Sequence, residues 1–342
     1  MKFSARFLTT SLAFAAPLLV WSQSSDFKVK DTIKIGGSGG WDYLTADSQN
    51  RRLYVSHGTE VEVVDLDSHK VVGKISGMQR IHGIAVADDL GSGFITDGGA
   101  NELVKFDLKT SQVQKRIKTG TNPDGLVYDG ASKRVFTFNG RSQDATAVNA
   151  QDGTVAGTIK LGGKPEFPTT DEKGSVYVNI EDKNEIVKID SKSLAVGGHW
   201  PVAPCESPSG MAIDRENRRL FSVCDGKVMA VVDADSGKVV ATPAIGEGPD
   251  AAAFDPGTHN AFSSNGQSGT LTVVHQDSPD KYSVAQTVDT ARGARTMALD
   301  EKTHSVYLVT ADFGPAAAAT AQNPRPRPSI QPGSFKLLVV AP

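Results

Sequence analysis

The sequence repeats one β-rich pattern seven times, and this repetition constrains the fold more than any other feature. In the fifth copy, apolar segments lie at 210–213 and 219–222, and a third at 229–233 ends in Asp. Copies follow one another at a spacing of about 43 residues, and turn dipeptides such as Asp-Gly and Asn-Gly separate the segments. Apolar residues at helical spacing are nearly absent after the first 22 residues. The pattern therefore predicts an all-β chain built from seven similar sheets.

A repeat of this length is typical of the four-stranded blades of a β-propeller. We place the blades at about 36–77, 78–120, 121–163, 164–207, 208–248, 249–293 and 294–342. The last unit runs out after its third strand, and the alternating segment 27–35 can supply the fourth. A solenoid would need capping repeats, which the sequence does not show. We therefore predict a single seven-bladed β-propeller domain over 23–342, with four antiparallel strands per blade, closed by an N-terminal strand that joins the last blade.

The N-terminal region has the pattern of a signal peptide. Lys2 and Arg6 precede an apolar stretch at 7–21, and the small side chains of Val20 and Ser22 suit a cleavage site. We expect a signal peptide over 1–22 and a periplasmic or secreted protein, with an uncleaved anchor as the alternative. The apolar stretch is short for a membrane span, and we expect no transmembrane segment in the mature chain, which we expect to be a monomer.

The two cysteines, Cys205 and Cys224, form an even pair, which in an exported protein indicates a disulfide. Both map to the same face of the predicted fifth blade. A bond between them would close a loop of about 20 residues and stabilise the fold.

The repeats resemble those of the YVTN/YncE-type family of seven-bladed β-propellers. The resemblance rests on Leu-Tyr-Val or Val-Tyr-Val segments, on the strand that ends in Asp, and on Lys-Val-Val at 70–72 and 238–240. It covers nearly the whole mature chain. It implies the propeller fold and a periplasmic or surface-associated location, with DNA or ligand binding proposed for some members. It implies no catalytic motif.

Aligning the seven units predicts two rings of residues around one mouth of the central channel. The inner strands begin at Asp42, His82, Asp124, Glu166, Ser209, Asp250 and Arg295. The second strands end at His57, Asp97, Asn139, Ile180, Cys224, Asn265 and Thr310. Charges that differ between equivalent repeat positions are expected of a binding site on a repeat scaffold. A solvated rim of turn-forming residues is the alternative.

His57 and His82 belong to neighbouring units, and both map to the mouth. With Asp97 or Asp42 they could form a His and carboxylate site for Zn²⁺ or another divalent ion, the one cofactor that the sequence suggests. Turn-capping histidines without a ligand are the alternative. Arg295, with Arg80 and Lys164, could instead bind an anionic group or form salt bridges within the ring.

A Pro- and Ala-rich segment, 312–333, interrupts the last unit. Long insertions in compact domains are usually functional or disordered. Arg325 and Arg327 could close over the acidic mouth as a lid, or the segment could be a mobile surface loop.

The chain has 36 basic and 39 acidic residues, a balance that argues against a broad phosphate-binding surface. We therefore expect an exported binding or scaffold protein that recognises a small molecule, a peptide or an envelope protein at the mouth. A metal-assisted hydrolase or lyase at the same mouth is the first alternative, and nucleic-acid binding, which the resemblance suggests, is the second. No CxxCH motif for covalent haem is present.

Overall fold

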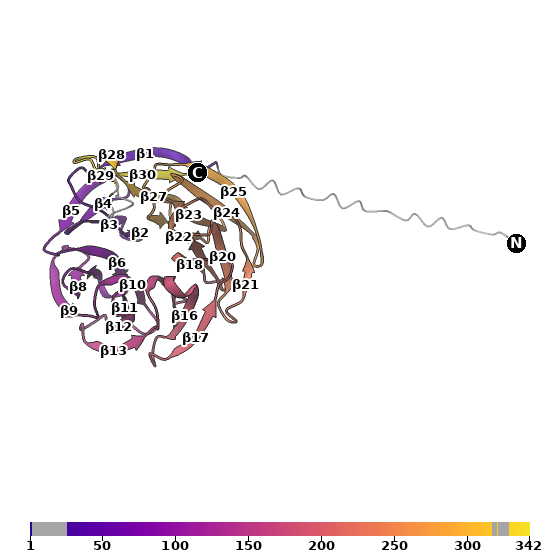
Figure 1. Ribbon diagram of the computed structural model, residues 1–342, viewed down its shortest axis with the longest axis horizontal. Coiled ribbons are helices and arrows are strands. Elements are labelled where there is room, and N and C mark those ends of the chain that lie inside the picture. The colour runs from indigo at the N-terminus through magenta and orange to yellow at the C-terminus, as the bar shows by residue number, and fades with distance from the viewer. Residues whose placement is uncertain (2–25, 317–319, 321–327) are drawn as a thin grey trace.

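Seven four-stranded antiparallel sheets stand around a central axis (Figure 1). The structure is a computed structural model that describes residues 1, 26–316, 320 and 328–342. Each innermost strand contacts the innermost strand of the next blade, and that of the last blade contacts that of the first, so the ring is closed. This confirms the predicted seven-bladed β-propeller. The expected signal peptide, apart from Met1, and the expected lid residues Arg325 and Arg327 lie outside the described residues.

The first three blades are continuous in sequence, and their strands run from the channel outwards. Blade 1 contains β2 (Leu44–Asp47), β3 (Arg52–His57), β4 (Glu60–Asp65) and β5 (Lys70–Ile75). Blade 2 contains β6 (Ile81–Ala87), β7 (Ser92–Asp97), β8 (Glu102–Asp107) and β9 (Val113–Lys118). Blade 3 contains β10 (Pro123–Asp129), β11 (Arg134–Asn139), β12 (Asp144–Asn149) and β13 (Val155–Lys160).

The next three blades follow the same plan. Blade 4 contains β14 (Pro165–Thr170), β15 (Ser175–Ile180), β16 (Glu185–Asp190) and β17 (Val196–Pro201). Blade 5 contains β18 (Pro208–Asp214), β19 (Arg219–Cys224), β20 (Val228–Asp233) and β21 (Val239–Ala241). Blade 6 contains β22 (Pro249–Asp255), β23 (Asn260–Asn265), β24 (Thr270–Ser278) and β25 (Lys281–Asp289). Two short 3₁₀ turns, at Asp88–Leu90 and Glu181–Lys183, are the helical elements of the described residues.

Blade 7 joins the two ends of the chain. Its strands are β26 (Met297–Asp300), β27 (Ser305–Thr310), β30 (Lys336–Ala341) and, outermost, β1 (Lys28–Lys34). β1 pairs antiparallel with β30, which confirms the predicted closing strand. Between β27 and β30, β28 (Phe313–Ala316) and β29 (Pro328–Ile330) form a two-stranded hairpin at the base of the Pro- and Ala-rich insertion.

The hydrophobic core lies between neighbouring blades. Tyr54 and Val63 of blade 1, for example, pack with Ile95, Val104 and Phe106 of blade 2. The second and third strands of each blade are buried on both faces, and β-branched and aromatic residues suit such strands. The outermost strands are largely exposed, as in β5. Among the described residues, no helix is long and apolar enough to cross a membrane.

Candidate functional site

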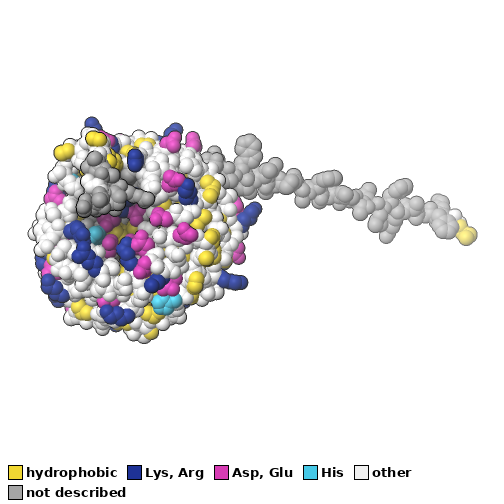
Figure 2. All heavy atoms as spheres, viewed as in Figure 1, with side chains coloured by type: hydrophobic (Ala, Val, Ile, Leu, Met, Phe, Trp, Pro, Cys, Tyr) yellow, Lys and Arg dark blue, Asp and Glu magenta, His cyan; other side chains and the backbone are white. Residues whose placement is uncertain are grey.

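The backbone leaves the regular sheet ladder where the inner strands begin. In β10 the pairing with β11 shifts register between Pro123 and Leu126, and β6 shifts in the same way between Ile81 and Ile84. Bulges of this kind re-aim a side chain that would otherwise follow the pleat. Equivalent shifts occur in β14, β18 and β22, so this irregularity surrounds each predicted first-ring residue from His82 to Asp250. Acidic and basic side chains surround the centre of the face shown in Figure 2.

The first ring forms an almost continuous chain of polar contacts. Ser209 donates a hydrogen bond to Asp250 (2.8 Å), and Asp250 pairs with Arg295. Arg295 also lies 3.4 Å from Asp42 Oδ1, and Asp42 Oδ2 lies 2.7 Å from His82 Nδ1.

The chain of contacts stops at Asp124. Its Oδ1 lies 3.6 Å from His82 Nδ1, too far for a hydrogen bond, and within the described residues its carboxylate accepts none. The next ring member, Glu166, pairs with Lys164 Nζ at 2.6 Å. In the described part of the chain no hydrogen bond or salt bridge joins Asp124 to Glu166 or Glu166 to Ser209, so the open sector of the ring spans blades 3 to 5.

The expected cations of the mouth already have polar partners, and two of them form salt bridges. Arg295 bridges Asp42 and Asp250, Lys164 bridges Glu166 and Glu181, and Arg80 bonds Asn122. These partners favour the salt-bridge interpretation over an anion site.

Two aromatic rings meet across the channel next to this ring. Tyr43 of blade 1 stacks on Phe167 of blade 4, with ring centroids 4.1 Å apart. Tyr43 is 8 % exposed, and its hydroxyl has no hydrogen-bond partner among the described residues. A methyl group on Gly125 would come 3.0 Å from this hydroxyl, so glycine permits the close approach next to Asp124. The mouth thus combines a ring of charged side chains with an aromatic pair, Tyr43 and Phe167.

Burial and like charge raise the carboxyl pKa values in the open sector. Burial, together with the charge of Asp42, raises the pKa of Asp124 to about 6. Burial and the charge of Asp124 raise the pKa of Glu166 to about 7. Burial alone would lower the pKa of His82, but the hydrogen bond to Asp42 and the charge of Asp124 outweigh it and raise that pKa. Burial and the same carboxylates hold the pKa of Tyr43 well above its ordinary value. The carboxyl groups of Asp124 and Glu166 therefore lose their protons closer to neutral pH than ordinary carboxyl groups do.

The second predicted ring does not line the mouth. All seven of its residues are at most 4 % exposed: His57, Asp97, Asn139, Ile180, Cys224, Asn265 and Thr310. Asp97 accepts the backbone N–H groups of Gln79 and Arg80, at 2.9 and 3.0 Å. Asn139 and Asn265 donate to side chains of their own third strands. These polar side chains form hydrogen bonds with the backbone and side chains of the segments around the ends of the second strands. Asp and Asn commonly form such local hydrogen bonds in turns.

The predicted metal ligands His57, His82 and Asp97 are not brought together within the described part of the chain. His57 is buried, its ring stacks on Phe335 at 4.0 Å, and its Nδ1 lies 3.3 Å from Glu62 Oε1. His82 instead faces Asp42 and Asp124. The reason is that the second strands end below the rim, whereas the bulged inner strands project onto it.

Sequence reasoning missed three residues whose hydroxyl groups bond the backbone where the inner strands begin. The hydroxyl of Thr96 donates to the backbone oxygen of Asp124 (2.6 Å) and accepts from the N–H of Gly83 (2.8 Å). Ser56 accepts from the N–H of Asp42 (2.7 Å), and Ser264 donates to Arg295 O. Each is the polar residue just before the end of a second strand, a repeated position that the sequence alignment could have revealed.

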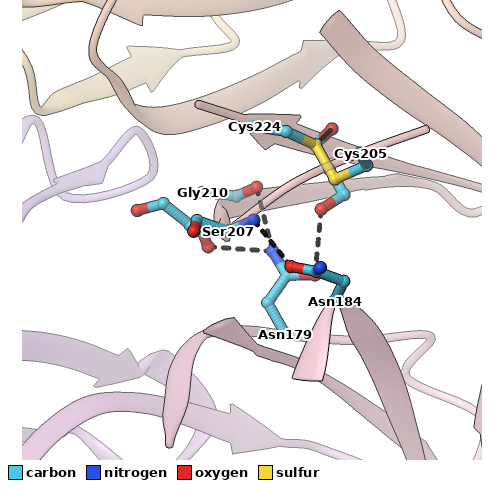
Figure 3. Close-up of a disulfide and its surroundings, with 8 residues drawn as sticks. Asn179, Asn184, Cys205, Ser207, Gly210 and Cys224 are labelled. Atoms are coloured by element: carbon cyan, nitrogen blue, oxygen red, sulfur yellow. Dashed lines mark hydrogen bonds between the residues drawn. A yellow bond between two sulfur atoms is a disulfide. The ribbon is translucent and has the colours of Figure 1, made fainter. Parts of the chain in front are cut away.

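A disulfide joins Cys205 to Cys224, with Cα atoms 5.4 Å apart (Figure 3). It ties the loop before β18 to the end of β19. In the same region Asn179 donates to the backbone oxygens of Ser209 and Gly210, and Asn184 accepts from the N–H of Ser207. This loop leads into the ring at Ser209, so these contacts fix the backbone of the mouth in blade 5.

Two surface hollows lie away from the mouth. The larger, of about 570 Å³, lies where β6 and β10 end, and includes Asp88, Asp89 and Lys133. Asp89 already accepts from Tyr128 and pairs with Lys133. The smaller, of about 320 Å³, lies beside β24. The mouth is the better candidate, because the carboxylate of Asp124 accepts no hydrogen bond among the described residues, whereas Asp89 of the larger hollow already has its partners.

The comparisons with known proteins support the fold. No protein-family profile and no curated protein sequence matches the chain. Kuenenia stuttgartiensis hydrazine synthase is 14% identical, with a TM-score of 0.69 over 84% of this chain and 95% of that chain. The U3-55K structure is 9% identical, with a TM-score of 0.72 over 92% and 98%. A streptogramin B lyase is 14% identical, with a TM-score of 0.71 over 92% and 98%. Similarity at such identities shows the fold alone.

Proposed function

We propose that this chain is an exported binding propeller that holds a small, positively charged ligand at the mouth. The observation that carries the proposal is the carboxylate of Asp124, which lies at the rim, is about four-fifths buried and accepts no hydrogen bond among the described residues. A largely buried carboxylate that accepts no hydrogen bond is costly, and a ligand that donates hydrogen bonds or carries positive charge relieves that cost.

The charge of the ring favours a cation. Four carboxylates (Asp42, Asp124, Glu166 and Asp250) face three permanent cations, Arg295, Lys164 and Arg80. Protons on Asp124, Glu166 and His82 make up much of the difference, as their raised pKa values indicate. A positively charged ligand can replace those protons, so we expect binding to release them and to strengthen as the pH rises.

The aromatic pair suits an organic cation, and the carboxylates suit an organic cation or a metal ion. If an ammonium group contacts the Tyr43 and Phe167 rings, their faces attract it, and the nearby carboxylates attract it as well. A peptide or envelope protein could present such a group as a lysine side chain. The residues of the mouth thus support ligand recognition without requiring a reaction.

Export and family membership belong to the same proposal. The N-terminal pattern of the sequence and the disulfide support an oxidising compartment outside the cytoplasm. The repeat motifs support membership of the YVTN/YncE-type family. Cell fractionation with N-terminal sequencing tests export, and we expect a mature chain that begins at Gln23.

Thermal shift and calorimetric titration test the binding function. The probes are a primary amine, a quaternary ammonium ion and divalent metal ions, with acetate and phosphate as anionic counterparts. Asp124→Asn should abolish binding of whichever cation binds, whereas Asp289→Asn, which changes an exposed carboxylate at the end of β25, should not. Binding of anions in preference to cations, or equal cation binding by both variants, would contradict the proposal.

A metal-assisted lyase or hydrolase is a second candidate, favoured by the Asp42–His82 pair. Asp42 engages Nδ1 of His82, and the buried Nε2 has no partner among the described residues. An imidazole oriented in this way can act as a general base. A lyase is among the chains that share the fold. Turnover that His82→Ala abolishes and His304→Ala spares would favour this candidate over a purely binding role.

A further inference from the structure

We propose that the mouth binds a divalent metal ion through Asp42, His82 and Asp124. This inference rests on the proposed function and specifies the cation at that site. The three residues come from three consecutive blades and include only one of the histidines that the sequence pairs.

The donor atoms are close enough to share one ion. His82 Nδ1 lies 2.7 Å from Asp42 Oδ2 and 3.6 Å from Asp124 Oδ1, and the three donors all lie within 4.8 Å of one another. Ligand atoms around Zn²⁺ lie about 2.0–2.2 Å from the ion, so donors separated by about 3–4 Å can bind it together. One imidazole and two carboxylates suit Zn²⁺ or Mn²⁺ and leave coordination positions for water or a ligand.

The backbone holds these donors in place. The N–H of Asp42 donates a hydrogen bond to Ser56. The hydroxyl of Thr96 donates to the carbonyl of Asp124. The same hydroxyl accepts from the N–H of Gly83, which is next to His82. Little reorganisation is therefore needed when an ion binds.

The hydroxyl of Tyr43 provides independent evidence of a missing ligand. This phenol is more than nine-tenths buried, has no partner among the described residues, and lies near Asp124 and Glu166. Buried hydroxyls are normally hydrogen-bonded. A water or ligand atom on the metal would give this hydroxyl a partner.

Neighbouring charges leave room for the ion. Arg295 engages the other oxygen of Asp42 and also binds Asp250, and Lys164 pairs with Glu166. Arg80, the other cation that faces His82, bonds Asn122. The proposed ion lies between His82 Nδ1 and the carboxylates of Asp42 and Asp124, where the three donors approach one another.

The second cluster of potential ligands does not compete. His57, Glu60 and Glu62 also approach one another, but Lys74 Nζ lies 2.7 Å from Glu60 and 3.0 Å from Glu62. Burial would raise the pKa of Glu62, but His57 and Lys74 lower it below its ordinary value. The ammonium group of Lys74 already neutralises charge in this cluster.

Calorimetric titration of the purified, chelator-treated protein with Zn²⁺ and Mn²⁺ tests the site. We expect one ion per chain and a loss of affinity of about 100-fold or more in Asp42→Asn and in His82→Ala. The control is His304→Ala, which removes a His–Asp pair of similar geometry, with His304 Nδ1 2.8 Å from Asp255 Oδ2. It should bind as the wild type does. Unchanged affinity in the two mouth variants would overturn the inference.

X-ray absorption of the Zn²⁺-loaded wild-type protein gives a second readout that does not depend on variants. We expect one imidazole nitrogen and otherwise oxygen ligands, and two imidazoles or no imidazole would overturn the assignment. Asp124-dependent binding of a primary amine without any metal binding would overturn the inference and leave the proposed function standing. Failure of every cation to bind would overturn both.

Discussion

Tyr43 and Phe167 stack with ring centroids 4.1 Å apart, although Tyr43 belongs to blade 1 and Phe167 to blade 4. The two rings therefore meet across the channel, next to the charged ring. We expect a ligand at the mouth to contact these rings and to face Asp124 and Glu166.

Removing the Tyr43 hydroxyl should not destabilise the protein. Because this buried hydroxyl has no partner among the described residues, we expect Tyr43→Phe to leave the free energy of unfolding unchanged or to raise it by up to about 1 kcal/mol. Tyr177→Phe is the matched control, since the Tyr177 hydroxyl donates to Ala234 O at 3.1 Å, and it should lose about 1 kcal/mol. Urea denaturation of the ligand-free protein measures both. A larger loss in Tyr43→Phe than in Tyr177→Phe would show that the hydroxyl is bonded.

Phe27 should anchor the closing strand. It is buried, packs edge-on against Phe262 of blade 6, and exchanges backbone hydrogen bonds with the side chain of Gln286. Phe27→Ala should cost about 3–5 kcal/mol in the free energy of unfolding. Val29→Ala, at an exposed position of β1, should cost much less. Equal effects of the two substitutions in urea denaturation would argue against this anchoring role.

The repeat made the propeller and its closing strand predictable, because each blade needs the same alternation of apolar residues and turns. The positions of the first-ring residues could also be predicted from the repeat, because Asp124 and His82 occupy equivalent positions at equivalent bulges. The contacts between side chains inside the mouth could not be predicted from the repeat. Whether Tyr43 contacts Phe167 depends on how far each side chain extends across the channel. His57 is buried because the second strands end in buried segments. The spacing of the repeat predicts neither of these features.

Loss of the disulfide should weaken the fold. For a sequence separation of 19 residues between Cys205 and Cys224, the chain-entropy estimate is about 3 kcal/mol. Both sulfurs are buried, so Cys205→Ala/Cys224→Ala avoids leaving unpaired polar groups in their place. Chemical denaturation under non-reducing conditions should show that loss. Thiol titration of the unfolded wild type should find no free cysteine before reduction, and two reactive thiols at that stage would contradict the pairing.

The contribution of Asp124 and Glu166 to the stability of the ligand-free protein should fall between about pH 4 and pH 7. Asp124 and Glu166 have folded-state pKa values of about 6 and about 7, above the ordinary values of their unfolded forms. The folded state therefore binds more protons in this range, and stability decreases as the pH rises. Glu166→Gln should flatten this decrease, whereas Asp289→Asn should retain it. A Glu166→Gln variant with the same pH profile as the wild type in denaturation experiments would contradict the raised pKa.

The most direct test of a cation site at Asp124 is calorimetric titration of the wild-type protein and Asp124→Asn at pH 5.5 and pH 7.5, with Zn²⁺ and with a primary amine. We predict that at least one cation binds the wild type, more tightly at pH 7.5 and with release of protons, because Asp124 and His82 must lose theirs. The variant should lose this binding at both pH values. Binding that is independent of pH and unchanged in Asp124→Asn would contradict the account.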